Sequence, residues 1–355
     1  MTELLVGTKK GLFALEGAPG APFEVTARAF AGEPVEYALR DPRTGRVLAS
    51  VTSPFYGPKL WYADDPAGEW EQASGVALPD GGDVALERIW VIVPGEANGT
   101  LYAGGDPGVL FESRDGGATW ELNRGLWEHP TRERWQPGGG GLCLHSIVTW
   151  PGEPGRLAVG ISAAGVWLSD DGGATWRSGN EGLVPRYLPE DTPPEDLGLC
   201  VHRLQRAPQR PERVFMQFHG GVYRSDDAGE TWVDIGAGLP SDFGFPLAVH
   251  PTDPDRAYVI PLTADSDRVT PEGRVRVYET GDAGASWAPR GDGLPQQHAY
   301  LTVLREAFDR AGEDDEFELY FGATSGDVFA SPDAGATWAG AATHLPPVYS
   351  VSARR

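Results

Sequence analysis

Two segments of the sequence repeat the pattern Cys-x-His, which could bind a metal ion or support acid–base catalysis. They are Cys143-Leu-His145 and Cys200-Val-His202. Residues i and i+2 of a β-strand point to the same face, so each cysteine should point the same way as its histidine. Thiolate and neutral imidazole are ligands of transition metals, and a histidine can also act as a general base near neutral pH.

Three interpretations of these pairs are open. One is a site for a divalent transition metal, formed by His145 and His202 and completed by His219 or His298. Another is a histidine general base. In the third, the cysteines are small buried residues and the histidines line the centre of the fold through hydrogen bonds. A disulfide is disfavoured in a cytoplasmic chain.

An eight-residue motif indicates which elements position these residues. Its pattern is Ser/Thr-x-Asp-x-Gly-x-Ser/Thr-Trp, and its five copies end at Trp120, Trp176, Trp232, Trp287 and Trp338, with a degraded copy ending at Trp70. Successive tryptophans are 50, 56, 56, 55 and 51 residues apart. The Ser and Asp oxygens can accept hydrogen bonds from the backbone of a tight turn, and the glycine supplies a positive φ. A period near 50 residues predicts the blades of a β-propeller.

Each period contains four strand-like segments, which gives six blades. Their inner strands are expected to start at Glu36, Glu87, Leu144, Val201, Phe245 and Tyr300. The strands at the N-terminus lack an inner partner, and residues 347–352 supply one, so the two chain ends close a seventh blade. The prediction is an all-β, seven-bladed β-propeller, with residues 1–355 forming a single domain.

Composition excludes several classes of protein. The 355 residues include 48 Gly and 31 Pro, too many for a helical bundle. With 29 basic and 51 acidic residues, the net charge of −22 disfavours nucleic acid and anionic membrane surfaces as partners. The N-terminus lacks the features of a signal peptide and no apolar window is long enough to span a membrane, so we expect a cytoplasmic protein.

Polar and aromatic residues gather on one predicted face. In a four-stranded blade, the loop entering the inner strand and the loop between the second and third strands open on the same face, opposite the repeated motif. The residues expected on this face are Glu87, Asp106, Trp127, Trp135, His145, His202, His219, Asp242, Arg268 and Tyr300. The long insertions 121–142, 177–199 and 262–273 belong to it as well. The mouth of the central channel is therefore the expected site.

Some of these residues suggest chemistry on sugars. Asp106, Asp242 and Glu87 offer carboxylates for glycoside hydrolysis, which requires a separation of about 5–9.5 Å, although each carboxylate could equally cap a turn. Trp127 and Trp135 could stack on a sugar or another flat ligand, or anchor their loops.

The repeated motif resembles the BNR/Asp-box repeats of β-propellers such as sialidases, sortilin-like receptors and photosystem II assembly factors. Residues 125–130, 137–145, 219–225 and 239–246 resemble a bacterial group described as sialidase-like or glycosyl hydrolase BNR proteins. The resemblance implies the fold and a hydrolase-type label, but no mechanism. The Phe/Tyr-Arg-Ile-Pro segment of sialidases is missing, with Arg88-Ile89-Trp90 the nearest fragment, and sialidases have six blades. Sialidase activity is therefore not expected.

Two functions are consistent with these features. In the first, the protein binds a small polar or glycan-like ligand at the channel mouth and acts on it as a hydrolase or lyase. The residues assigned to this role are His145, His202 and His219 as base or metal ligands, and Tyr300, Asp242 and Arg268 as substrate-orienting groups. In the second, the protein is a non-enzymatic scaffold for a protein partner, and side chains plug the channel mouth.

Overall fold

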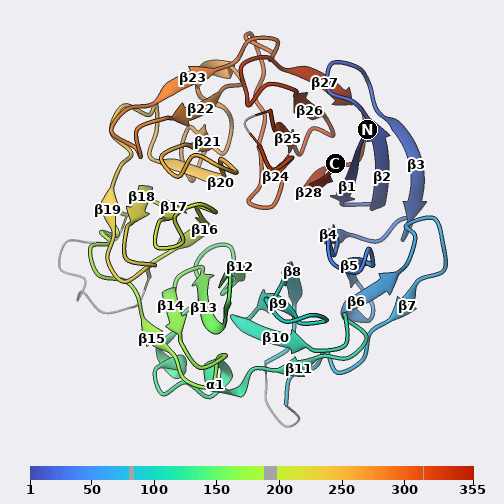
Figure 1. The fold of residues 1–355 in the computed structure, drawn as a ribbon, viewed down its shortest axis with the longest axis vertical. Coiled ribbons are helices and arrows are strands. Elements are labelled where there is room, and N and C mark those ends of the chain that lie inside the picture. Colours follow the sequence, from blue (N-terminus) through green and yellow to red (C-terminus); the bar gives the residue numbers. More distant parts are fainter. Residues whose placement is uncertain (80–83, 188–197, 315) are drawn as a thin grey trace.

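The computed structural model describes residues 1–79, 84–187, 198–314 and 316–355. These residues form seven four-stranded antiparallel sheets in a ring around a central axis (Figure 1). The predicted all-β, seven-bladed β-propeller is confirmed. Part of the insertion expected at 177–199 lies outside the described residues, at 188–197. Within the described ranges, no helix is long and apolar enough to cross a membrane.

The strands of each sheet are given in their order from the central axis outward. The innermost strands are β4 (Val35–Arg40), β8 (Arg88–Pro94), β12 (Leu144–Trp150), β16 (Val201–Arg206), β20 (Phe243–Val249), β24 (Phe308–Ala311) and β28 (Val348–Arg354). The second strands are β5 (Val47–Ser53), β9 (Leu101–Asp106), β13 (Glu153–Ile161), β17 (Val214–Phe218), β21 (Ala257–Leu262), β25 (Glu318–Gly322) and β1 (Thr2–Thr8).

The outer half of each sheet has one regular strand and one rim strand. The third strands are β6 (Gly57–Ala63), β10 (Val109–Ser113), β14 (Gly165–Ser169), β18 (Gly221–Ser225), β22 (Val277–Thr280), β26 (Val328–Ser331) and β2 (Gly11–Gly17). The rim strands are β7 (Glu71–Gln72), β11 (Glu121–Leu122), β15 (Arg177–Ser178), β19 (Val233–Asp234), β23 (Ala288–Arg290), β27 (Ala339–Ala342) and β3 (Glu24–Ala29). Short helical turns lie at α1 (Arg124–Trp127), Arg132–Arg134 and Pro271–Gly273.

The two ends of the chain close the ring. The last strand, β28, pairs antiparallel with the first strand, β1, from Glu3↔Arg354 to Thr8↔Val348. The N- and C-termini consequently lie side by side (Figure 1). The pairing predicted for residues 347–352 is therefore present, and it covers the edge of β1 that would otherwise be free to pair with another chain.

The expected start of one inner strand was wrong. β24 begins at Phe308 rather than at Tyr300. The preceding residues instead bond to the loop around Pro271–Gly273, because the Ala299 N–H donates to the Gly273 carbonyl and the Thr270 N–H donates to the Leu301 carbonyl. Residues 300–307 therefore cross the mouth face before the strand starts.

The repeated motif forms a turn of constant geometry in all five copies. In the last copy, the Gly335 N–H donates to Ser331 Oγ at 2.8 Å, and Thr337 donates to Asp333 through both its N–H and its hydroxyl, each at 2.7 Å. The Trp338 N–H then donates to the Asp292 carbonyl of the preceding blade. Each turn of this kind connects third and rim strands, and this one also ties two neighbouring blades together.

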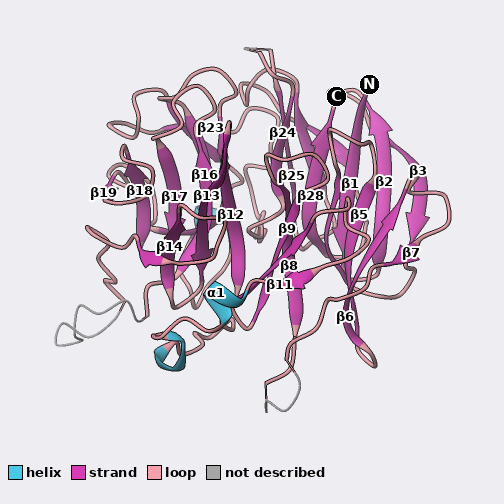
Figure 2. Cartoon of the chain, turned by 60° about the horizontal axis from the view of Figure 1, so that its bottom comes forward, coloured by secondary structure: helices cyan, strands magenta, loops and turns pink. Residues whose placement is uncertain are grey.

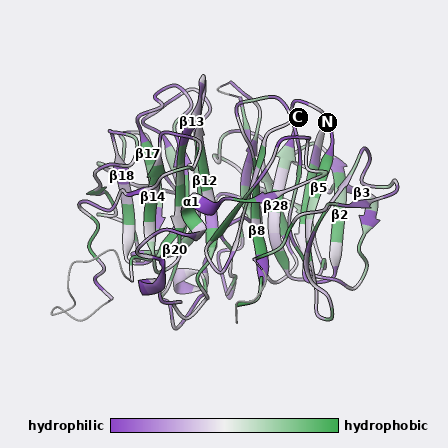
Figure 3. Ribbon diagram, turned by 90° about the horizontal axis from the view of Figure 1, so that it is seen from below, coloured by the Kyte–Doolittle hydropathy of each residue, from purple (hydrophilic) through white to green (hydrophobic). Residues whose placement is uncertain are grey.

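Apolar side chains pack between the sheets. In an oblique view, the strands run roughly along the axis and loops connect them at both ends (Figure 2). The hydrophobic residues are concentrated in the strands (Figure 3). In β20 every residue from Phe243 to Val249 is buried. An inner strand lies between its two neighbouring blades, so both of its faces are covered.

Removing the motif carboxylate should weaken the fold. Asp333→Ala removes three hydrogen bonds from an exposed turn, so we expect a loss of about 1–2 kcal/mol in the free energy of unfolding, measured by urea denaturation. Although burial opposes ionisation, hydrogen bonds from Thr337 and Ser331 hold the pKa of Asp333 below its usual value. The stabilisation is therefore present above the unfolded pKa, about 3.9, and is lost as pH falls through the lower folded pKa.

The matched control is Asp170→Ala, which changes an exposed motif position whose carboxylate pairs with Arg177 on the surface. It should change stability by less than about 0.5 kcal/mol. Two results would contradict the stabilising role of the ionised Asp333 carboxylate. One is an equal loss of unfolding free energy in the two variants, and the other is a loss for Asp333→Ala that stays the same in acid.

Candidate functional site

Six of the inner strands carry an extra residue, a β-bulge, within the first few residues of the strand. In β4, β8, β12 and β16 this residue is Glu36, Trp90, His145 or His202, and in β28 it is Tyr349. In β20 the register shifts across Phe245 and Pro246. A β-bulge of this kind interrupts the ladder and changes the direction of the extra side chain. In these six blades the bulges lie at the same end, whereas β24 pairs with β25 without a register shift.

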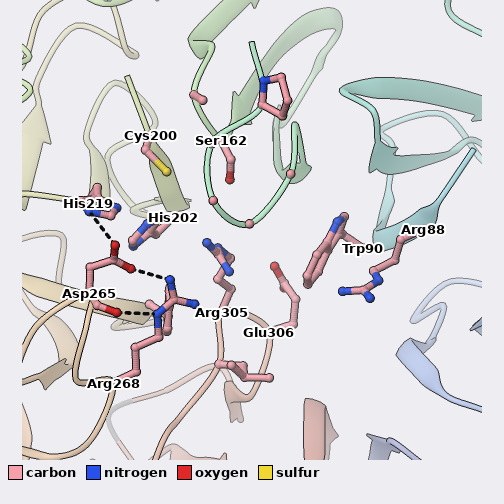
Figure 4. Close-up of a pocket in the computed structure, with 18 of the residues that line it drawn as sticks. Arg88, Trp90, Ser162, Cys200, His202, His219, Asp265, Arg268, Arg305 and Glu306 are labelled. Carbon is pink, nitrogen blue, oxygen red and sulfur yellow. Dashed lines mark hydrogen bonds and ion pairs between the residues drawn. The ribbon is translucent and has the colours of Figure 1, made fainter. Parts of the chain in front are cut away.

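A cavity of about 670 Å³ opens at this end of the axis. All seven blades contribute to its wall, and five of the bulge positions are among its lining residues: Glu36, Trp90, His202, Phe245 and Tyr349. Other parts of the wall include the Gly138–Gly141 run, Cys200 and His219. The wall also includes Asp265 and Arg268 and residues 304–306, of which Arg305 and Glu306 are seen in Figure 4. The channel mouth is therefore hollow, whereas the scaffold hypothesis expected it to be plugged.

Three arginines and two aromatic rings alternate across this cavity. The Arg305 guanidinium carbon lies 4.5 Å from the ring centroid of Phe245 and 5.9 Å from that of Trp90. Arg268 lies 5.4 Å from Phe245, and Arg88 lies 4.6 Å from Trp90. The order is thus Arg88, Trp90, Arg305, Phe245, Arg268. A guanidinium stacked on a ring keeps the N–H groups at its edge available for hydrogen bonds.

Most charges around the cavity are paired. Arg88 pairs with Glu36 at 3.3 Å, Arg268 pairs with Asp265, and the more deeply placed Arg203 pairs with Glu306. Arg305 differs, because it has no ion pair with any residue that the structure describes. Asp309, whose carboxylate acts on both Arg203 and Glu306, brings the carboxylates to four against four arginines, so the group has no formal surplus of charge. Arg305 is distinguished instead by having no direct ion partner among the described residues.

Among the described residues that line the cavity, three polar atoms lack a hydrogen-bond partner: Arg305 Nε, Trp90 Nε1 and Glu306 Oε1. Leaving a polar atom buried and unsatisfied costs about 1–3 kcal/mol, so such atoms are rare unless a ligand or water pairs with them. All three belong to residues that line the cavity. These two donors and one acceptor are buried, so a polar molecule or water would have to enter the wall of the cavity to pair with them.

Burial changes the protonation of the carboxyl groups. It raises the pKa of Glu36, against the opposing effect of the Arg88 guanidinium, and it raises the pKa of Glu306, against the effect of Arg203. Burial also lowers the pKa of the Arg305 guanidinium. A buried carboxyl group of raised pKa can hold a proton closer to neutral pH, which is the property that a general acid needs.

Cys200, His202 and His219 form a compact group on one wall of the cavity. Their potential ligand atoms all lie within 4.8 Å of one another. Desolvation lowers the pKa of His202 well below its usual value, and burial also lowers the pKa of His219, so both rings are neutral near pH 7. Asp265 lies 3.9 Å from His219 Nε2.

The structure places His202, His219 and Arg268, three of the residues predicted from sequence, in the cavity wall. His145 occupies a bulge position but is fully buried, and its Nε2 is 2.9 Å from Ser162 Oγ. It is not part of the Cys200 group. Asp106 lies behind the glycine run, where Cys143 Sγ donates to it at 3.5 Å.

The other predicted residues lie away from the cavity wall. Tyr300 is 62% exposed, and Asp242 and Glu87 are exposed as well. Trp135 is buried against Trp167, and Arg132 stacks on Trp127 at 4.0 Å, so both tryptophans stabilise the 121–142 insertion. The roles assigned to these residues from sequence remain untested predictions.

Sequence reasoning missed Arg305, Glu306, Trp90 and Glu36. The Arg-Glu pair at 305–306 is a usable signal, because two adjacent charges interrupt an otherwise apolar segment just before an inner strand. It went unnoticed because the strand was expected to start at Tyr300. Arg203 and Glu306 are 103 residues apart, so nothing local indicates their pairing.

Comparisons with known proteins support the fold and point to glycan-active relatives. No protein-family model matches the chain. The chain is 25% identical over 219 residues to the oligoxyloglucan-reducing end-specific xyloglucanase of Emericella nidulans, a match that covers 52% of this chain and 26% of that protein. The chain thus spans about a quarter of the length of this curated relative.

Solved structures show the same fold at low identity. The GH74 xyloglucanase of Xanthomonas campestris superimposes with a TM-score of 0.58 at 17% identity, over 99% of this chain and 53% of that one. YCF48 bound to D1 peptide gives a TM-score of 0.51 at 14% identity, over 90% of this chain and 84% of that one. At these identities the likeness shows that the three chains share a propeller fold.

The contribution of the buried Arg203–Glu306 ion pair to stability can be tested by substitution. Arg203→Met leaves the Glu306 carboxylate buried without its partner, so we expect a loss of about 3–5 kcal/mol in the free energy of unfolding, measured by urea denaturation. The double variant Arg203→Met/Glu306→Leu removes both charges and should recover much of that loss. If Arg203→Met is as stable as the native protein, the ion pair does not contribute to the stability of this part of the fold.

Proposed function

We propose that this protein is a hydrolase that binds a small glycan-like substrate bearing a carboxylate at the mouth of the propeller. The observation that carries the proposal is Arg305. Its guanidinium is stacked between Phe245 and Trp90, lines the cavity and has no carboxylate partner among the described residues. Arginine binds planar anions through two parallel hydrogen bonds, so a carboxylate supplies the missing partner.

The charge of the whole protein supports selectivity for one small anion at this position. The net charge of −22 repels anions from most of the surface. The Arg305 guanidinium, which has no direct carboxylate partner among the described residues, opposes that effect locally, because a low-dielectric wall strengthens its attraction for an anion. A polyanion such as nucleic acid would be repelled, whereas a single carboxylate that enters the mouth would be bound.

Hydrolysis is supported by the carboxyl groups and by the relatives. Glu306 directs Oε2 to Arg203 and leaves Oε1 without a partner, and burial raises its pKa. We assign Glu306 as the general acid that donates a proton to the leaving glycosidic oxygen, and Glu36 as the second carboxyl group, which activates water. The xyloglucanase relatives act on glycans, and the partly exposed ring of Trp90 offers apolar surface of the kind that sugars contact.

The proposal is tested with 4-nitrophenyl glycosides in uronic acid and neutral forms. We expect the native protein to cleave a uronide faster than the matching neutral glycoside. Glu306→Gln keeps an oxygen for Arg203 but cannot donate a carboxyl proton, and it should lower kcat by about 100-fold or more. Activity should fall as pH rises through the raised pKa of Glu306, because only the protonated form donates.

Arg305→Met should lower kcat/KM for the uronide by about 10- to 100-fold and change that for the neutral glycoside little, because it removes only the charge-assisted contact. Arg124→Met is the control, since Arg124 is exposed on α1 and pairs only with Glu128. If kcat/KM is the same for the uronide and the neutral glycoside, in the native protein as well as in Arg305→Met, the proposal of an anionic substrate is refuted. Absence of uronide binding and cleavage by the native protein would refute the proposal as a whole.

A second candidate function is peptide binding by a scaffold. It is favoured by Phe55 and Tyr56, which are 84% and 81% exposed in the loop between β5 and β6 on the mouth face. Exposed aromatic residues are common at protein interfaces. YCF48, a structural neighbour, is bound to a peptide.

The two candidates are separated by substitution at the rim. If a peptide partner docks there, Phe55→Ser/Tyr56→Ser should weaken capture of peptides from a display library at least 10-fold while Arg305→Met leaves it unchanged. Peptide capture that is insensitive to the rim variant, or absent from the native protein, would count against the scaffold function.

A further inference from the structure

A second site adjoins Arg305 on the wall formed by β16 and β17. Cys200 immediately precedes β16, His202 is the bulge residue of β16, and His219 follows the end of β17. Among the residues that the structure describes, these three form the one group of cysteine, histidine and acidic side chains whose ligand atoms converge in this way, all within 4.8 Å of one another. In Figure 4 the three side chains come from neighbouring strands and lie together at the edge of the cavity.

Hydrogen bonds fix the orientation of His202. Its Nδ1 lies 2.6 Å from the Gly244 carbonyl oxygen. A carbonyl can only accept a hydrogen bond, so Nδ1 carries the proton and Nε2 of the neutral ring carries the lone pair. A histidine that donates to a backbone carbonyl through one nitrogen is the usual arrangement of a metal ligand. Phe243 and Phe245 pack against the same ring at 5.5 and 4.9 Å and hold it in place.

Tyr187 positions the other two side chains. The Cys200 N–H donates to Tyr187 Oη at 2.7 Å, and Tyr187 Oη donates to the Gly198 carbonyl at 2.5 Å. The ring of Tyr187 also packs on His219, with 4.3 Å between ring centroids. One side chain therefore orients both remaining members of the group, as an outer-shell residue does at a metal centre.

We propose that Cys200, His202 and His219 bind one zinc ion whose fourth coordination position faces the cavity. Zinc takes thiolate and imidazole ligands, and three protein ligands with one open position is the arrangement of catalytic rather than structural zinc. Zinc–ligand bonds of about 2.0–2.3 Å require the three ligand atoms to move closer together than the 4.8 Å limit. Because His202 is held in place, this movement would fall to Cys200 and His219, which are both partly exposed.

The site adds a Lewis acid to the proposed function, yet it does not depend on that function. Zinc bound to one thiolate keeps a single positive charge. With Arg305 nearby, two positive charges would then face the cavity, because the carboxylate of Asp265 beside His219 is already paired with Arg268. An anionic oxygen of the substrate is the complementary ligand for the open position. The chemistry supplied there is polarisation of that oxygen or of a water molecule.

The test is a cobalt titration of the full-length protein after removal of bound metal by chelation and dialysis. We expect one equivalent of Co²⁺ to produce a thiolate-to-cobalt charge-transfer band and the visible bands of tetrahedral cobalt, and one equivalent of Zn²⁺ to abolish both. Cys200→Ser should remove the charge-transfer band and weaken metal binding by about 100-fold or more. Tyr187→Phe should weaken binding by about 10-fold, as loss of an outer-shell contact does.

The matched control is Cys143→Ser, which changes the other cysteine, whose thiol contacts Asp106 and Gly140 instead. It should keep the full spectrum. Circular dichroism and urea unfolding of each metal-free variant separate loss of ligation from loss of fold, and His219→Gln, at a partly exposed position, provides a second ligand variant. A charge-transfer band that survives Cys200→Ser, or no band in the native protein, would overturn the site.

The outcome is distinguishable from failure of the proposed function. Arg305→Met and Glu306→Gln should bind cobalt as the native protein does, because neither residue is a ligand. If uronide binding is lost in Arg305→Met while cobalt binding is absent from the native protein, the substrate proposal holds and the zinc site does not. If the native protein binds cobalt but does not bind a uronide, the zinc site holds and the substrate proposal does not.

Discussion

Closure of the ring by β28 and β1 is the interaction on which the site depends. This pairing places Ser350 beside Glu306 in a parallel bridge, and the Val351 N–H donates to the Glu306 carbonyl at 2.9 Å. Arg305 and Glu306 precede β24 and lie outside any strand, so the closing strand supplies the backbone contacts that fix them. Without β28, the edge of β1 would be free, and the segment that carries Arg305 would lose its backbone contacts.

The same arrangement reconciles an acidic protein with a site for anions. Arg203 neutralises Glu306 beneath the floor, and Arg88 and Arg268 each neutralise a carboxylate at the wall. Arg305 is left to face the cavity, stacked on apolar rings that exclude water from its faces. Affinity and selectivity would both come from this one group, because the rest of the molecule carries charge of the opposite sign.

The fold was predictable from sequence because its signal is repeated. The Ser-Asp-Gly-Trp spacing recurs at a nearly constant interval, and each copy encodes the same hydrogen-bonded turn, so the number of blades and the closing strand followed from counting. The face that bears the site was predictable for a related reason. His202 stands near the start of an inner strand, and His219 and Arg268 lie in loops between second and third strands, so their shared end of the blades could be assigned.

The details of the site were less predictable, because they depend on bulges and on pairs that are distant in sequence. The two Cys-x-His segments look equivalent, yet Cys200 and His202 converge whereas Cys143 contacts Asp106 and His145 contacts Ser162. Strict alternation in a strand cannot distinguish them, since a bulge breaks the alternation at each histidine. The partner of Glu306 lies on another blade, and no local pattern specifies it.

The position of the bulges bears on how such a molecule changes over evolutionary time. A bulged residue is outside the regular ladder, so the strand keeps its pairing whatever side chain stands there. Glu, Trp, His and Tyr already occupy equivalent places in different blades of one chain. The lining of the mouth can therefore diverge one residue at a time while the seven sheets keep their register, which makes this end of the ring a scaffold on which new specificities can arise without refolding the rest.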